Sequence, residues 1–310
     1  MNGKVLVTGG LGNLGSWISA HLANLGYEVY ILSRSSKQKI ANIKYTLIEA
    51  DVTKIDELRE KLNFDLDFCV HLASYNEFFL PDYAKNALDI NTFGTRNLLE
   101  VLSEKKLKNF VYLSTFHVYG ASEGTITEKS ELNPKNDYAS THLFAEYYVK
   151  QFGFTHDLKY TVLRLTNSYG APTFTESDKW YLVLNDLTRS AYENGKIILK
   201  SNGRAKRDFI YMGDVSDIIE KLLRINATNE IYNLSSNRTY EVIELAYLIK
   251  NEYEKRYKRH IDIEINKDDK SSYNDVSVKN DKLRSLIDFE TKDKMKEEIN
   301  KIFDLLECKL

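Results

Sequence analysis

The stretch Thr8-Gly9-Gly10-Leu11-Gly12-Asn13-Leu14-Gly15 lies between an apolar run at 4–8 and an amphipathic stretch at 13–25. Its glycines, three residues apart, match a turn that joins a strand to a helix over a phosphate. The first permits the tight turn, the second lets the backbone approach a pyrophosphate, and the third lets helix and strand pack closely. Because the free N–H groups of the helix start attract phosphate, this position predicts a dinucleotide-binding turn.

Short runs rich in β-branched residues alternate with amphipathic stretches downstream of this turn. We predict strands at 4–8, 28–32, 45–48, 68–72, 110–114 and 161–165. Apolar residues at three- and four-residue spacing predict helices at 13–25, 55–62, 82–103 and 138–152. This alternation predicts an α/β fold, a Rossmann-type doubly wound parallel sheet with a smaller C-terminal substrate domain.

The alternation weakens after residue 170. Residues 171–205 carry few strand signals, and 250–300 are so dense in Lys, Asp and Glu that we expect solvated helices and loops there. We therefore expect a dinucleotide-binding domain of residues 1–170 plus about 206–235. Residues 171–205 plus 236–310 would form the substrate-binding domain.

Composition narrows the class of partner. The 310 residues carry 43 basic and 45 acidic side chains, and this balance argues against nucleic acid and favours a small-molecule substrate. Two cysteines and six histidines show no ligand spacing, so we expect no metal. The sequence opens directly into an apolar strand, and no stretch approaches about 18 apolar residues. These features predict a cytoplasmic protein that does not bind membranes.

The second predicted strand bears on the choice of dinucleotide. Rossmann domains that prefer NAD usually carry an acid about 20 residues past the turn, whereas this strand is followed by Ser33 and Arg34. Arg34 could accept a 2′-phosphate, lie on the adenine, or simply be solvated. Asp51, at the end of the third strand, could bind the adenine amino group or form a turn.

Further motifs occur in order along nearly the whole chain. They are HLA at 71–73, NTFGTRNLL at 91–99, STFHVYG at 114–120, DYAS at 137–140, RLTNSYG at 164–170, RDFIYMGDV at 207–215 and YNLS at 232–235. In this order the chain resembles the extended short-chain dehydrogenase/reductases of the NAD-dependent nucleotide-sugar epimerase/dehydratase family. One block alone would be weak evidence, but their joint order and spacing are specific.

The resemblance implies NAD as the cofactor, while Arg34 leaves NADP open. The residues that it implies for cofactor binding are Gly9, Gly12, Asn13, Leu14, Gly15, Ser33, Arg34, Asp51, Val52, Leu72, Ala73, Ser74, Asn91, Tyr138 and His142.

The resemblance also implies a catalytic pair. Tyr138 would move the proton of a sugar hydroxyl, and Thr115 would bond the same oxygen. A phenol acts as a base near neutral pH only if its pKa falls by about 3 units, roughly 4 kcal/mol. Where the family has a lysine four residues after the tyrosine, this chain has His142, which we expect to be about one quarter protonated at pH 7 and to donate to the nicotinamide ribose. Three consequences stay open: a slower enzyme, a reaction that needs no strong base, or a site that binds cofactor without turnover.

On the substrate side, the resemblance implies contacts from Asn167 and Arg207 to the diphosphate or the nucleoside of the activated sugar, with Thr115 and Phe116 nearer the sugar. Tyr75, with its neighbours at 76–77, could border the sugar or form a plain surface loop. Many relatives carry a further arginine in the C-terminal third, but residues 271–281 contain none.

The expected function is oxidation at C4 of a nucleotide-linked hexose or heptose, by a dehydrogenase or an epimerase, in bacterial surface-polysaccharide synthesis. Oxidation of GDP-mannoheptose for capsule synthesis is one candidate. Phe116 and His117 follow Thr115 where dehydratases carry an acidic pair, which argues against 4,6-dehydration. The alternatives are a ketosugar reductase and a non-catalytic regulator that senses NAD(P). The resemblance also implies a homodimer or higher homo-oligomer, paired through the helices at about 82–105 and 138–153.

Overall fold

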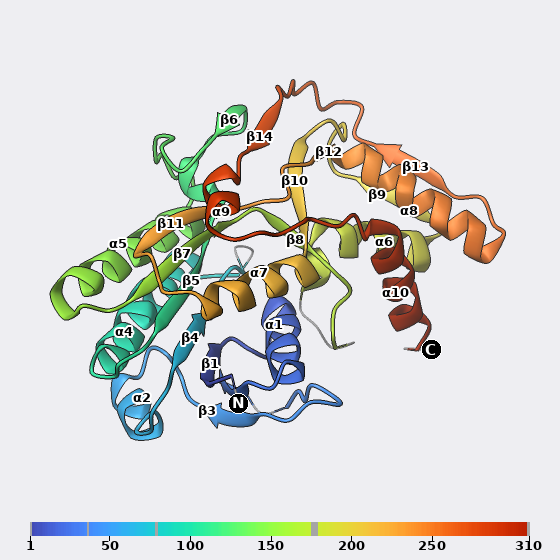
Figure 1. Cartoon of the computed structure of the whole chain (residues 1–310). Coiled ribbons are helices and arrows are strands. Elements are labelled where there is room, and N and C mark those ends of the chain that lie inside the picture. The colour runs from blue at the N-terminus through green and yellow to red at the C-terminus, as the bar shows by residue number, and fades with distance from the viewer. Residues whose placement is uncertain (1, 36, 78–79, 175–178, 309–310) are drawn as a thin grey trace.

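The computed structural model describes residues 2–35, 37–77, 80–174 and 179–308. Its centre is a parallel sheet of seven strands in the order β11-β7-β5-β4-β1-β2-β3 (Figure 1). The strands are β1 (Lys4–Thr8), β2 (Glu28–Ser33), β3 (Thr46–Glu49), β4 (Phe68–His71), β5 (Asn109–Thr115), β7 (Tyr160–Leu165) and β11 (Glu230–Leu234). The predicted α/β fold is confirmed. β11 is the strand that the sequence pattern missed.

Helices cover both faces of this sheet. α1 (Asn13–Asn24) and α7 (Met212–Arg224) pack together on one face, over a core that includes Ile18 and Ile218. α2 (Ile55–Lys61), α4 (Thr95–Ser103) and α5 (Asp137–His156) cover the other face. Strand order reverses between β1 and β4, so the loops after these two strands diverge at one edge of the sheet. Open parallel sheets bind ligands at this point.

The helix expected at 82–103 is divided into three segments. They are α3 (Tyr83–Ala87), the wider π-helical η1 (Leu88–Gly94) and α4. The wider turns place Asn91 and Thr92 inward, where their side chains bond the side chain and carbonyl of Thr141. Short π-helical segments are frequent near functional sites.

A second core lies beside the sheet, around α6 (Val183–Asn194), α8 (Val242–Tyr257) and α10 (Met295–Glu307) (Figure 1). It includes β9 (Lys196–Leu199), which pairs with β13 (Asp262–Ile265). The expectation of solvated helices at 250–300 is wrong for α10, whose Ile299, Ile302 and Phe303 are fully buried. The charged residues occupy its outer face, so the helix is amphipathic.

Smaller elements complete the structure. β8 (Asn167–Tyr169), β10 (Lys206–Tyr211) and β12 (Thr239–Glu241) form a three-stranded sheet, and β6 (Gly124–Ile126) pairs with β14 (Val276–Val278). Short helical turns occur at η2 (Phe116–Tyr119), η3 (Lys179–Tyr181) and α9 (Asp281–Leu286). β10 therefore joins β8 and β12 rather than the central sheet, and the proposed domain division stays a prediction. None of the helices in the described ranges carries a stretch long and apolar enough to cross a bilayer.

Candidate active site

A cavity of about 1230 Å³ opens at the carboxyl ends of the central strands, facing the second core. The loops after β1, β2, β4, β5 and β7 form one side, and residues of η3 and the start of α6 form the other. All the residues expected to bind cofactor line this cavity, with the exception of Asn91. Cofactor binding by these residues stays a prediction that the geometry permits.

The phosphate turn is held by its own backbone. Gly9 has φ +66°, and its carbonyl accepts a hydrogen bond from the Gly12 N–H at 2.8 Å. A Cβ on Gly15 would lie 2.1 Å from the Gly9 carbonyl oxygen, so the helix can approach the turn only without a side chain there. This cradle leaves the start of α1 open toward the cavity, as a pyrophosphate requires.

Asn13, the first residue of α1, points to the same ligand. Both polar atoms of its side-chain amide are buried and lack a hydrogen-bond partner among the described residues. Because leaving buried polar groups unpaired is costly, the arrangement suits a ligand that pairs with them. The turn and this amide therefore fit a bound dinucleotide.

The far end of the cavity is lined by Ser33, Arg34 and Asp51. One carboxylate oxygen of Asp51 accepts bonds from the N–H and the hydroxyl of Thr53, both at 2.9 Å. The turn-forming role considered for Asp51 is therefore present, and its position in the wall also allows contact with an adenine. Arg34 is exposed at the rim, which leaves its three possible roles open.

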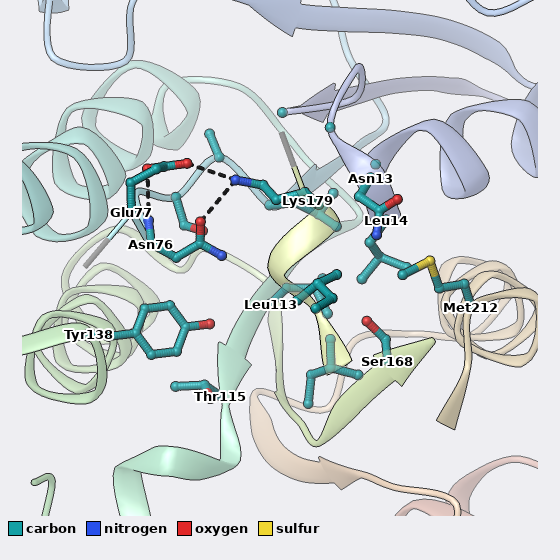
Figure 2. Close-up of a pocket in the computed structure, with 18 of the residues that line it drawn as sticks. Asn13, Leu14, Asn76, Glu77, Leu113, Thr115, Tyr138, Ser168, Lys179 and Met212 are labelled. Atoms are coloured by element: carbon teal, nitrogen blue, oxygen red, sulfur yellow. Dashed lines mark hydrogen bonds and ion pairs between the residues drawn. The ribbon is translucent and has the colours of Figure 1, made fainter. Parts of the chain in front are cut away.

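Tyr138 and Thr115 meet at the other end of the cavity. Tyr138 lies in the first turn of α5, where Asn136 caps the helix by accepting the Ala139 N–H at 2.9 Å. Figure 2 shows the Tyr138 hydroxyl pointing into the cavity, with Thr115 beside it. Burial raises the pKa of Tyr138 to about 12, and a hydrogen bond from Thr115 opposes this shift. The phenol is thus a proton donor in the free protein and needs added positive charge to act as a base.

His142 lies on α5 one turn after Tyr138, with the two rings edge to face and their centroids 4.6 Å apart. Burial, followed by proximity to His117, lowers its pKa to about 3. The expectation of a partly protonated ring at pH 7 is therefore wrong, because the side chain is only 3% exposed. His142 supplies no charge to Tyr138.

A cation that sequence reasoning missed does lie near the catalytic pair. Lys179 donates to the side-chain amide oxygen of Asn76 at 3.0 Å and to a Glu77 carboxylate oxygen at 2.7 Å, as Figure 2 shows. The Tyr181 hydroxyl donates to the same Asn76 oxygen at 2.9 Å. The charge of Lys179 lowers the pKa of Tyr138, although less than burial raises it. In the sequence, a lysine followed by two aromatic residues at 179–181 was only a weak indication of a functional residue, and no residue spacing linked it to Tyr138.

The substrate side includes Asn167, Arg207 and His117. The Asn167 amide donates to the Asp208 carbonyl at 2.9 Å, which fixes its orientation. His117 is accessible from the cavity, but the surrounding protein, followed by the charge of Arg207, lowers its pKa to about 4. The imidazole is therefore neutral beside a permanent guanidinium charge. This combination suits a substrate that carries phosphate near Arg207.

Three expected contacts lie away from the cavity wall. Asn91 is 1% exposed, and its side chain is occupied by the Tyr75 backbone and the Thr141 hydroxyl. The Tyr75 ring stacks on Tyr83, with the ring centroids 5.8 Å apart, and is not among the residues that line the cavity. Phe116 packs on the small apolar cluster behind η2. Their neighbours Asn76, Glu77 and Tyr83 line the cavity in their place.

A buried ion pair connects α5, the helix that carries Tyr138, to the central sheet. Arg164 on β7 binds both carboxylate oxygens of Glu146 on α5, at 3.0 and 2.7 Å, and both side chains are at most 2% exposed. Glu146 also accepts from Ser114, the residue before Thr115, at 2.5 Å. The pair ties α5 to β5 and β7. Arg164 therefore has a supporting role inside the core rather than a contact with the cavity.

The chain is similar to known proteins over most of its length. The model of the NAD dependent epimerase/dehydratase family matches residues 5–235. A putative UDP-glucose 4-epimerase of Methanocaldococcus jannaschii is 30% identical over 256 residues, which cover 80% of this chain and 82% of that protein. Human dTDP-D-glucose 4,6-dehydratase is 28% identical over 258 residues, covering 78% and 72% of the two chains. The crystal structure of UDP-N-acetylglucosamine 4-epimerase from Bacillus cereus superposes with a TM-score of 0.80 at 25% identity, over 98% and 99% of the two chains.

Proposed function

Since the chain belongs to the NAD-dependent epimerase/dehydratase family of nucleotide-sugar enzymes, we propose that it oxidises the C4 hydroxyl of a nucleotide-linked hexose or heptose. Reduction of the enzyme-bound ketosugar would then complete a 4-epimerisation. The observation that carries this proposal is the pairing of Tyr138 and Thr115 at one end of a cavity that the phosphate turn also lines. A 4-dehydrogenase, which would release the ketosugar, differs only in the fate of that intermediate.

The roles of the chain's own residues follow from their placement. When bound, NAD supplies the acceptor for the hydride that leaves C4. Tyr138 takes the hydroxyl proton, so that the alcohol becomes a ketone as its C–H and O–H bonds break. Thr115 donates to the same oxygen and restricts its position. The turn at 9–15 and Asn13 hold the diphosphate of the cofactor, and Arg207 and Asn167 hold that of the sugar nucleotide.

The residues beside Thr115 argue against dehydration. Phe116 packs away from the cavity, and His117 is held neutral by its surroundings. Loss of water from the sugar needs an acid and a base next to the ketone, and this strand end offers no carboxyl pair there. We therefore do not propose 4,6-dehydration for this chain, although the human relative is named as a 4,6-dehydratase.

A ketosugar reductase is the second candidate, and a specific observation favours it. Reduction requires a proton donor at Tyr138, and the pKa of about 12 keeps that phenol protonated. The two directions share one site and differ in the ionisation of Tyr138 at the working pH.

A screen of UDP-, GDP- and dTDP-linked sugars tests the proposal. Each sugar is added with NAD, while absorbance in the reduced-nicotinamide band and the sugar NMR spectrum are followed. Epimerisation predicts a changed C4 configuration without net NADH, and dehydrogenation predicts stoichiometric NADH. NAD binding with no turnover of any sugar or ketosugar would contradict the proposal and favour the regulator.

We further place the reaction in the cytoplasm, in the supply of sugars to bacterial surface polysaccharides, as the resemblance implies. GDP-mannoheptose belongs in the screen for that reason. A cell that lacks the protein should then lose one sugar from its surface polysaccharide. An unchanged sugar composition would count against this role.

We also propose a homodimer built on η1 and α5. Phe93, Phe144 and Tyr147 on these helices are 46%, 47% and 52% exposed, which is unusual for large apolar side chains. A second copy of the chain would cover them in an isologous contact. Sedimentation at micromolar concentration should give a dimer, and Phe144→Glu should give a monomer.

A further inference from the structure

The two ring nitrogens of His142 lie in different surroundings. Nδ1 is 2.7 Å from the hydroxyl oxygen of Tyr112, a 2% exposed residue on β5. Nε2 is buried and has no hydrogen-bond partner within the described part of the chain. The ring also lines the cavity, one helical turn from Tyr138. One nitrogen is therefore fixed by the protein, while the other is left for something else.

The chemistry of a neutral imidazole decides which nitrogen carries the proton. Such a ring has one N–H donor and one acceptor. Burial raises the pKa of Tyr112 well above that of a free phenol, so its hydroxyl is protonated and needs an acceptor. If His142 Nδ1 carried the proton instead, the Tyr112 hydrogen would have to compete for the Thr95 hydroxyl, which also lies beside the phenol and is already bonded to His71 and to the Asn91 carbonyl. Tyr112 therefore donates to Nδ1, and the His142 proton lies on Nε2.

The Tyr112 ring is packed between the rings of two histidines. Its ring lies between those of His71 and His142, with centroids 5.6 and 6.0 Å away and interplanar angles of 29°. His71 is itself held on both sides, by the Thr8 hydroxyl at 2.5 Å and the Thr95 hydroxyl at 2.9 Å. All of these side chains are at most 3% exposed. The stack is fully buried, and both histidines in it are neutral at pH 7 because burial lowers their pKa values to about 3.

We propose that Tyr112 is a positioning residue that holds His142 as the Nε2–H tautomer, and that this N–H donates to a ribose hydroxyl of the bound cofactor. The inference rests on the cofactor contact in the proposed function. It explains how the chain can lack the family lysine: a fixed neutral donor replaces the cation in the hydrogen bond, although not in the charge. Binding of the ribose is thereby separated from stabilisation of the Tyr138 phenolate.

The tautomer can be measured without substrate. In ¹⁵N-labelled protein at pH 7, two-bond ¹H–¹⁵N spectra distinguish protonated from bare ring nitrogens, and His142→Ala identifies the His142 signals among six histidines. We expect a protonated Nε2 and a bare Nδ1. In Tyr112→Phe the signals should move toward a mixture of tautomers. A protonated Nδ1 or an imidazolium in the unmodified protein would overturn the proposal.

A double-mutant cycle on NAD affinity tests the second half. Loss of the fixed donor should weaken NAD binding about fivefold in Tyr112→Phe, the scale of one hydrogen bond. In the His142→Ala background the same substitution should have no further effect, because Tyr112 then has no ring to orient. An equal loss in both backgrounds, or no loss in the first, would overturn the proposal.

Tyr119→Phe is the matched control. Tyr119 is also 2% exposed, and its hydroxyl donates to Asn233 at 2.6 Å, outside the cavity wall. This variant loses a comparable buried bond but should keep the His142 tautomer and NAD affinity. Because neither readout uses a sugar, failure of the sugar screen with the expected tautomer and affinities would overturn the proposed function alone.

Discussion

The phosphate turn and the catalytic face are adjacent, but the turn is formed by backbone and the catalytic face by side chains. The turn at 8–15 is one continuous segment, and its shape depends on backbone that lies too close for side chains. The catalytic face combines Thr115, Tyr138, His142 and Lys179 from β5, α5 and η3. A site formed by backbone depends on every residue of one continuous segment. A site formed by side chains can differ at one residue, because another segment can supply a side chain of the same charge. His142 stands where the resemblance implies a lysine, and Lys179 on η3 lowers the pKa of Tyr138.

The largest expected effect comes from Tyr138→Phe. Removing the proton-transfer group should lower turnover by at least about a hundredfold, the usual range for a general acid or base. NAD affinity should stay within about twofold, because the phosphate turn is untouched. Stopped-flow turnover and NAD titration check the two halves. Equal activity would remove Tyr138 from the mechanism, while lost NAD binding would mean that the two regions are not independent.

Gly15→Ala should affect the other region through stability. Its new Cβ would lie 2.1 Å from the Gly9 carbonyl oxygen, which is backbone and not a flexible side chain, so we expect a cost of about 2–3 kcal/mol of unfolding free energy. Gly12→Ala is the comparison, since its Cβ would lie 3.0 Å from the same Gly9 oxygen. That variant should stay nearly as stable and lose NAD affinity instead. Denaturant unfolding that ranks the two variants the other way would refute this view of the turn.

This difference also explains what the sequence could predict. The turn and six of the seven strands of the central sheet follow from local patterns, because each depends on residues close in the chain, whereas the roles expected for Tyr138 and Thr115 come from the resemblance to the family. The neutral state of His142 does not, since it depends on burial by partners such as Tyr112, 30 residues away. Lys179 lies 41 positions from Tyr138, in a stretch with few recognisable signals. The apolar face of α10 was hidden for a similar reason, because its dense charges obscured the periodicity.

His142→Lys tests whether the catalytic face lacks charge. A cation one turn from Tyr138 favours the phenolate and should lower its apparent pKa by up to about one unit, roughly 1.4 kcal/mol. Because oxidation needs the phenolate, activity should then rise at lower pH, by about tenfold at a fixed pH on the rising limb. His142→Met, which adds no charge, is the control and should cause no such shift. Lost NAD binding in the lysine variant would mean that the pocket is shaped around imidazole.

The smallest expected effect concerns Lys179 and Glu77, which bond each other at 2.7 Å. Lys179→Met removes the cation and leaves the carboxylate, so the apparent pKa of Tyr138 should rise and the activity profile should move to higher pH. Glu77→Gln removes a negative charge beside that cation and should move the profile to lower pH. Because Lys179 contributes less than burial to the pKa of Tyr138, we expect each shift to be a few tenths of a unit, about twofold in rate at fixed pH. Both variants break the same ion pair, so a merely structural role would move the two pH profiles in the same direction. Opposite shifts would show that this distant segment supplies the charge that α5 lacks.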